Sequence, residues 1–418
     1  MWIILVAFFC LPLKFVDVQA GLISYDGHEV IRTYPADQEQ MQMLGKLREN
    51  FDFWSEPKIG GPTDIRVGGN RKTMLRNFLK QKGIKYDVYI SDLQDRISRE
   101  REQLKRSNTM DWTSYHSASD INMWLESLAF NYPDIATVYD IGTSTEGRPI
   151  RLIHIGIPRT SGPLKQGYWI DGGMHAREWV GPAVATWVIN ELVTNSDQYQ
   201  DMLTEIDFYI VPIVNVDGYE YSRTKDRLWR KTRSNHKSRA GCLGVDPNRN
   251  FDYFWGGEGT SSDKCSEIYK GPTPFSEPET AAMRDYITKI SGKTVNWVTY
   301  IALHSYAQMI LTPWGYETNL YPEDYAELKQ VADEAASALT ACYGTHYDVG
   351  AAGTILYPAA GASDDWSKGS GYFRLVYTFE VRDTGRYGFL LPADQIIPTA
   401  IETWAALKVF GRHMTEKK

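Results

Sequence analysis

From Ser107 to the end of the chain, short apolar runs alternate with longer amphipathic segments, and this alternation restricts the fold more than any other feature. The apolar runs are typical of buried strands and lie at 150–157, 167–170, 208–214, 295–303 and 375–379. The segments between them predict helices at 119–130, 182–193, 278–290, 325–342 and 398–410. Strands that alternate with helices over ~300 residues predict one α/β domain with a mixed, mostly buried central sheet flanked by helices.

A smaller unit precedes this domain. Residues 21 to 90 follow the order β-α-β-β-α-β, which predicts a small α+β fold with an antiparallel sheet. Residues 92–106 lack Gly and Pro and carry charge pairs four residues apart, so we expect an exposed helix there. That helix ends in Lys105-Arg106, a dibasic pair that a trypsin-like protease could cut, although an uncut linker helix fits the same residues.

The first residues are typical of an export signal. An apolar run from Trp2 to Leu13 is too short to span a bilayer, and Val18-Gln19-Ala20 supplies small residues for cleavage. A buried N-terminal helix is the alternative. No later apolar stretch is long enough to span a membrane, and a net charge of −7 gives no support to nucleic-acid binding. We therefore expect a secreted protein with a signal at 1–20, a removable segment at 21–106 and a large domain at 107–418.

Candidate metal ligands follow two of the predicted strands. His175 and Glu178 come after the strand at 167–170, and His304 ends the strand at 295–303. Zinc favours such nitrogen and oxygen donors, and three protein ligands leave one position for water. Glu380 follows another strand, where a buried carboxylate needs a partner or a function. Each motif also has a plain alternative, namely a surface His beside a solvated Glu, or a hydrogen-bonded core His.

Together these motifs resemble those of the secreted zinc carboxypeptidases of the pancreatic A/B type. The resemblance covers nearly the whole chain and includes His175-x-x-Glu178, the interval to His304, the segment 246–250 and the closing segment 378–386. It implies an inhibitory propeptide at 21–106, with connecting helix, cleaved after Arg106 by a trypsin-like protease. It also implies one Zn²⁺ per chain, peptide or protein C-termini as substrates, and a monomer that binds neither nucleic acid nor membrane.

The resemblance implies a role for each site residue. His175, Glu178 and His304 correspond to zinc ligands, and Glu380 to the general base. Arg230 would polarise the scissile carbonyl, although a place in a basic surface run is its plain alternative. Arg249 with Asn248 would bind the terminal carboxylate, and Tyr357 would close over it. Four further residues resemble positions that contact the penultimate residues of the substrate: Arg177, Ser305, Tyr306 and Phe389.

The resemblance implies that the segment 357–366 lines the pocket for the terminal side chain and sets specificity. Asp364 stands where B-type enzymes carry Asp, which predicts release of C-terminal Lys or Arg. Its alternatives are a turn-capping role, with Asp365 in the pocket, or an A-like preference for apolar or aromatic ends. Ala362 replaces the glycine usual in this loop and could narrow the pocket.

The cysteines and the missing motifs complete the sequence-based expectations. Cys242 and Cys265 resemble the family's disulfide pair, and Cys342 is expected to be a buried free thiol. A catalytically inactive zinc protein that binds C-termini is the competing class, and no G-x-S-x-G motif supports a serine hydrolase. The sequence Ser276-Glu277-Pro278-Glu279 predicts a capping box at the start of the helix at 278–290.

Overall fold

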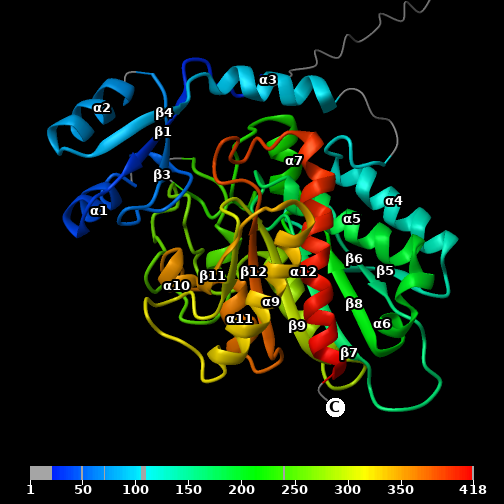
Figure 1. Ribbon diagram of the computed structural model, residues 1–418. Coiled ribbons are helices and arrows are strands. Elements are labelled where there is room, and N and C mark those ends of the chain that lie inside the picture. Colours follow the sequence, from blue (N-terminus) through cyan, green and yellow to red (C-terminus); the bar gives the residue numbers. More distant parts are fainter. Residues whose placement is uncertain (1–20, 49, 70, 105–109, 239–240, 417–418) are drawn as a thin grey trace, which may run out of the picture.

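The computed structural model describes residues 21–416 except 49, 70, 105–109 and 239–240. The predicted signal at 1–20 and the predicted cleavage position Arg106 lie outside the described residues. A small unit with its own sheet lies at one end of a larger α/β body, and a connecting helix runs from it across that end (Figure 1).

The small unit has the predicted order β-α-β-β-α-β. Its sheet is antiparallel, with strand order β2-β3-β1-β4, and one face packs against Leu44 of α1 and Leu75 of α2. Helix α3 confirms the predicted connecting helix. The elements are β1 (Glu29–Tyr34), α1 (Gln38–Gly45), β2 (Asp52–Phe53), β3 (Thr63–Val67), α2 (Arg71–Gln81), β4 (Lys85–Ile90) and α3 (Leu93–Leu104).

The large domain contains an eight-stranded sheet of order β11-β10-β12-β9-β7-β8-β6-β5. Strands β12, β9, β7 and β8 are mutually parallel, whereas β10, β6 and β5 pair antiparallel with their inner neighbours, so the predicted mixed sheet is confirmed. The strands are β5 (Ala136–Thr143), β6 (Pro149–Ile155), β7 (Gln166–Gly172), β8 (Ile206–Val211), β9 (Asn296–Ser305), β10 (Met309–Thr312), β11 (Asp348–Ala351) and β12 (Leu375–Val381).

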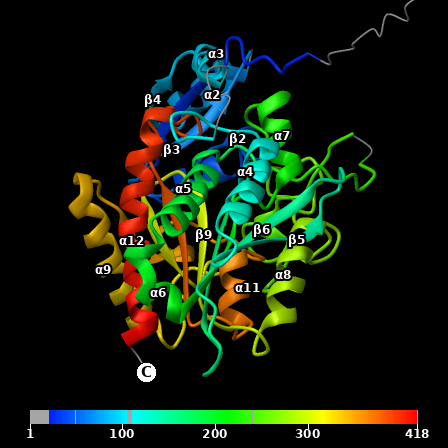
Figure 2. The ribbon, with the colours of Figure 1, turned by 90° about the vertical axis from the view of Figure 1, so that its right-hand side faces the viewer.

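Helices cover both faces of this sheet (Figure 2). Tyr168 of β7 donates from its hydroxyl to the Leu407 carbonyl of α12, whereas the next residue, Trp169, points to the opposite face and packs against Tyr286 of α8. Helices α5 and α9 pack beside α12. The helices are α4 (Ala118–Asn131), α5 (Val180–Thr194), α6 (Gln200–Glu205), α7 (Val216–Thr224), α8 (Pro278–Ile290), α9 (Tyr325–Tyr343), α10 (Ala352–Ile355), α11 (Ser363–Gly369) and α12 (Ile396–Glu416).

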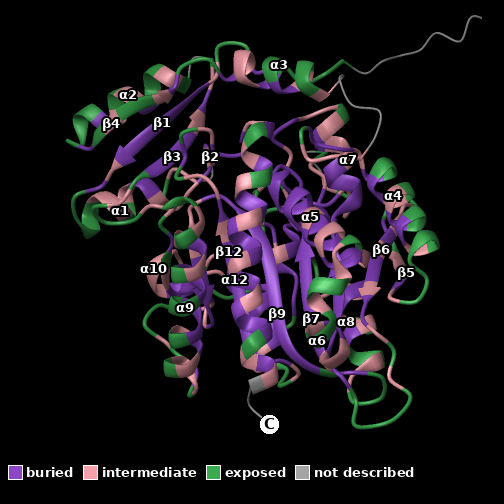
Figure 3. Cartoon of the chain, turned by 45° about the vertical axis from the view of Figure 1, so that its right-hand side comes forward, coloured by how far each residue is buried: buried purple, intermediate pink, exposed green. Residues whose placement is uncertain are grey.

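All five helices predicted for this domain are present, but the predicted capping box is wrong. Glu277 is the N-cap of α8 without a side-chain cap bond, and the Ser276 hydroxyl donates to the Glu277 carboxylate instead. The central strands are buried along nearly their whole length, while the outer faces of the helices are exposed (Figure 3). Among the residues that the structure describes, no helix is long and apolar enough to cross a membrane.

The small unit docks on the large domain at the end where β7, β9 and β12 terminate. Trp54 contacts Phe389, with ring centroids 5.0 Å apart, inside an apolar cluster that both units share. On α3, the buried carboxylate of Glu100 pairs with Arg227 of the large domain. This end of the sheet also carries the predicted site.

Candidate functional site

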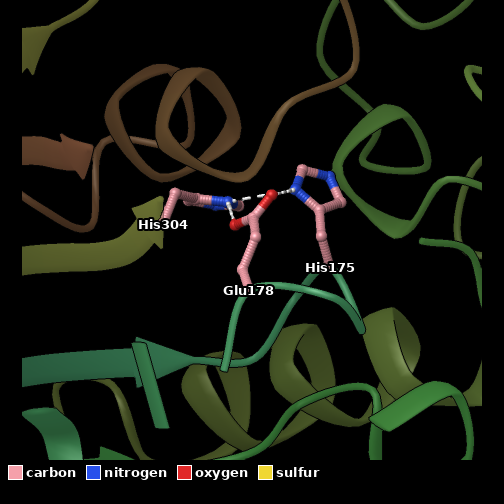
Figure 4. Close-up of side chains that lie close together, drawn as sticks. All are labelled: His175, Glu178 and His304. Carbon is pink, nitrogen blue, oxygen red and sulfur yellow. Dashed lines mark hydrogen bonds and ion pairs between the residues drawn. The ribbon is translucent and has the colours of Figure 1, made fainter. Parts of the chain in front are cut away.

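His175, Glu178 and His304 converge although two separate strands carry them (Figure 4). His175 and Glu178 lie in the turn between β7 and α5, and His304 is the penultimate residue of β9. Strands β7 and β9 are parallel neighbours, so their carboxyl ends meet at one edge of the sheet. All three side chains are buried.

The donor atoms of this cluster fit a tetrahedral zinc ion. Nδ1 of His175 lies 2.8 Å from Oε1 of Glu178, and Nδ1 of His304 lies 3.0 Å from Oε2 of the same carboxylate. The two Nδ1 atoms are 3.2 Å apart. Zinc at ~2.0–2.1 Å from each donor would separate the donors by ~3.3 Å, so small shifts suffice for binding.

Asp246 and Arg230 support the cluster from behind. Oδ1 of Asp246 lies 3.0 Å from Nε2 of His175, which leaves Nδ1 of that ring facing the metal position. Arg230 donates to the other oxygen of Asp246 at 2.8 Å and lies 3.8 Å from Glu178. Burial opposes charge on Asp246, but Arg230 and His175 hold its pKa well below the usual range.

Glu380 lies beside the metal ligands at the end of β12. It pairs in register with His304 and lines a cavity of about 250 Å³ together with Arg230, Tyr306 and Tyr357. Burial raises the pKa of Glu380 to about 8, against the opposing effect of His304. A cation held by the ligands would favour the carboxylate form, as a base requires.

Arg249 lines a second pocket, which shares Arg230 and Tyr357 with the first, and the two pockets together are called the groove. Asn248 directly precedes Arg249 in the chain. The Nε and Nη1 atoms of Arg249 donate to the carbonyls of Gly259 and Asn248, both at 2.8 Å, which fixes the plane of the guanidinium. Its Cζ atom lies 6.0 Å from the centre of the Tyr357 ring. Asn248 accepts a hydrogen bond from the Ser363 N–H at 2.9 Å, so this segment is joined to α11.

Asp364 lies in the first turn of α11. It is only 5% exposed, and its two oxygens accept from the Thr378 hydroxyl at 3.0 Å and the Asp365 N–H at 2.9 Å. The neighbouring Asp365 accepts from the Gly315 N–H at 2.8 Å. Burial, reinforced by Asp364, raises the pKa of Asp365 well above its usual range. Ala362 is the N-cap of α11 and is buried.

The small unit occupies the outer part of the groove. Arg177 is turned toward Asp52, with Nη1 to Oδ1 at 3.1 Å, and its guanidinium lies 4.2 Å from the centre of the Phe389 ring. The Tyr306 hydroxyl donates to Asp64 at 2.8 Å. Four residues were predicted to contact the penultimate part of a substrate. Ser305 alone among them has no bond or ring contact with the small unit in the described part of the chain, and it lines the cavity.

The cysteines follow the prediction in part. Cys242 and Cys265 form a disulfide that closes the loop containing Arg249. Cys342 is a free thiol in α9, as predicted, but it is half-buried rather than buried because its part of the helix faces outward.

Comparison with known proteins gives a consistent assignment. The family model described as zinc carboxypeptidase matches residues 121–406, and the model of the carboxypeptidase activation peptide matches residues 31–100. The chain belongs to the zinc carboxypeptidase family. It is therefore a zinc-dependent peptide hydrolase with an activation peptide, as the sequence predicted, and His175, Glu178 and His304 are the residues that could hold the zinc.

Three relatives indicate how far the similarity extends. Carboxypeptidase B of Astacus astacus is 49% identical over 307 residues, which cover 73% of this chain and 99% of the relative. Carboxypeptidase A2 of Rattus norvegicus is 38% identical over 94% of this chain and 95% of its own length. The crystal structure of thrombin activatable fibrinolysis inhibitor superposes with a TM-score of 0.85 at 33% identity, over 94% of this chain and 100% of that structure.

The sequence did not indicate the role of several residues in the site. Asp246 stands two residues before Asn248, within the segment 246–250 that carries part of the resemblance, but the sequence assigned it no role of its own. Asp52 and Asp64 gave no signal, because their partners lie at distant positions in the chain. Thr378 lies in the closing segment 378–386, but its contact with Asp364 was not indicated.

Proposed function

We propose that this chain is the zymogen of a secreted, monomeric carboxypeptidase that releases C-terminal Lys and Arg. The signal at 1–20 directs export, and cleavage after Arg106 frees the catalytic domain at 107–418 from the propeptide at 21–106. The observation that carries the basic specificity is Asp364, a buried carboxylate held in place by Thr378.

The reacting carbonyl lies between Glu380 and Arg230 in this proposal. Zinc bound by the three ligands supplies a water of lowered pKa. Glu380 accepts the proton of the attacking water and delivers it to the leaving amine. Arg230 donates hydrogen bonds to the oxygen on which negative charge develops, and its bond to Asp246 holds it in that position.

A free C-terminus is recognised by the part of the groove that Arg249 lines. The fixed plane of this guanidinium is suited to paired hydrogen bonds with a carboxylate. Asn248 adds an amide beside it, and Tyr357 closes over the bound terminus. Arg177, Ser305, Tyr306 and Phe389 contact the residues upstream once the propeptide has left. This requirement for a terminal carboxylate makes the enzyme an exopeptidase.

Asp364 attracts a cationic terminal side chain to the base of the pocket. A carboxylate that is already oriented by two donors needs little reorganisation to bind an ammonium or guanidinium group, and it disfavours acidic ends by repulsion. Release of an apolar or aromatic residue, as in A-type enzymes, would leave this buried charge unpaired.

The proposal is tested with trypsin-activated protein and matched peptides that end in Arg, Lys or Phe. We expect kcat/KM for Arg and Lys to exceed that for Phe at least ~100-fold, and a chelator to abolish all turnover until zinc is restored. Asp364→Asn should lower the Arg and Lys values ~100-fold because a buried charge pair contributes about 2–5 kcal/mol. Asp365→Asn is the matched control, and a preference for Phe in the unmodified enzyme would overturn the basic specificity.

A further inference from the structure

The two candidate ligand histidines differ in what lies behind their rings. Nε2 of His175 faces the carboxylate of Asp246 at 3.0 Å. Nε2 of His304 is also buried, but it has no hydrogen-bond partner among the residues that the structure describes. A histidine that binds zinc through Nδ1 carries its proton on Nε2, and this N–H almost always donates to a carboxylate, a carbonyl or a water. Leaving this buried N–H unpaired would be unfavourable, so an acceptor is required.

Asp171, the penultimate residue of β7, lies on the same face of the sheet as His304. It pairs in register with Ala302, and side chains alternate along a strand, so His304 is its diagonal neighbour on β9. Diagonal neighbours are ~7–8 Å apart, and Ala302, the residue paired with Asp171, has only a small side chain. Asp171 is fully buried. Its Oδ2 atom accepts from the Trp169 indole at 2.9 Å, whereas its Oδ1 atom has no partner of normal geometry.

Two hydroxyl groups complete this buried polar cluster. The hydroxyl of Tyr300, two residues before Ala302 on β9, lies close to both Asp171 and Ser363. Neither that hydroxyl nor the hydroxyl of Ser363 forms a hydrogen bond of normal geometry with a described residue. A buried water typically makes about three hydrogen bonds to groups of this kind. The cluster therefore combines a donor from His304 and an acceptor from Asp171 with two hydroxyls, each of which can donate or accept.

We propose that Asp171 is a positioning residue for the zinc ligand His304, which it holds through one buried water shared with the Tyr300 hydroxyl. The water accepts from Nε2–H of His304 and donates to Oδ1 of Asp171. This arrangement fixes the tautomer that presents Nδ1 to the metal, as Asp246 does directly for His175. The inference rests on the proposed function, in which His304 binds zinc.

The test measures zinc affinity of the full-length chain by competition with a chelator, independently of turnover. Asp171→Asn keeps the side-chain shape but weakens the acceptor, and we expect zinc affinity to fall about tenfold, since such outer partners typically contribute 10- to 100-fold. The absorption bands of the cobalt-substituted protein should shift as well. Asp246→Asn is the positive control, and Asp207→Asn, a buried aspartate of β8 that pairs with Lys165 away from the site, is the matched negative control.

A second variant and a second signal keep the test decisive if Asp171→Asn folds poorly. Tyr300→Phe removes one partner of the water, and we expect a two- to fivefold loss of zinc affinity together with a shifted proton resonance of the His304 ring N–H. Unchanged zinc affinity and cobalt spectra in both variants would overturn the inference, as would an equal loss in Asp207→Asn. If His304→Ala retained full zinc affinity, the proposed ligand set would fail instead.

Discussion

Replacing one propeptide carboxylate should weaken inhibition without harming the propeptide itself. Asp52 receives hydrogen bonds from Arg66 within the propeptide at 2.8 Å and from Arg177 of the catalytic domain at 3.1 Å. The Trp54 indole also donates to it at 3.1 Å. Asp52→Asn preserves the shape of this side chain and removes its charge, so Arg177 is left buried against a neutral group.

The expected size of the effect follows from the pKa of Asp52. Burial by itself would raise this pKa, but Arg177 and Arg66 outweigh burial and lower it from 3.8 to about 2. A shift of this size corresponds to about 2 kcal/mol of stabilisation of the ionised form. Part of it persists in the free propeptide, because Arg66 stays, whereas an unpaired buried Arg177 adds a further cost. We therefore expect inhibition to weaken about 10- to 100-fold.

The assay is the inhibition constant of separated propeptide 21–106 against the mature enzyme. This unit has its own apolar core, which includes Ile31, Ile65 and Leu75, and circular dichroism checks that the variant keeps its fold. Glu29→Gln is the matched control, because Glu29 pairs with Arg76 inside the propeptide. An Asp52→Asn propeptide that inhibits as strongly as the unmodified one, or a Glu29→Gln propeptide that is equally weakened, would refute the reasoning.

Three further predictions concern the pH dependence of propeptide binding, the general base and the disulfide. The pKa of Asp52 is lowered in the docked state, so its carboxylate stabilises the complex fully above pH ~4, and this contribution is lost as the pH falls toward 2. Size-exclusion chromatography of the cleaved complex should therefore show dissociation across that range. Glu380→Gln should bind zinc normally but lose at least ~100-fold in kcat, and full activity would contradict its role as base. Replacing Cys242 and Cys265 by Ser should lower the free energy of unfolding by about 3 kcal/mol, the value for a loop of this length, as urea titration can determine; an unchanged midpoint would contradict it.

Much of the fold could be predicted because the local pattern of apolar and polar residues indicates which faces of an element are buried. The run at 295–303 is apolar throughout, and the structure buries it as β9 between two layers of helices. The helix at 325–342 was predicted from an apolar face that packs against α12. Short elements such as β11 and α10, with four residues each, contain too few residues to show a period, so they were missed.

The site could be predicted only where its residues form a motif that is uncommon outside metal sites. His175 and Glu178 stand three residues apart after a strand, and this spacing is visible in the sequence. Whether Asp364 or Asp365 faces the pocket was left open, and the structure places the Thr378 hydroxyl on Asp364. That contact depends on how α11 packs on β12, which no local pattern encodes.

The sequence by itself determined the alternation of the main buried strands and helices, the donor set for zinc and the presence of a separate N-terminal unit. Only the tertiary structure decided which groups meet across long separations: His304 with Glu178, Asp246 with His175, and Asp52 with Arg177. The physical reason is that residue periodicity reports only which face of an element is buried. The partner of that face is set by the order of strands in the sheet and by the docking of the two units, both of which depend on contacts between distant residues.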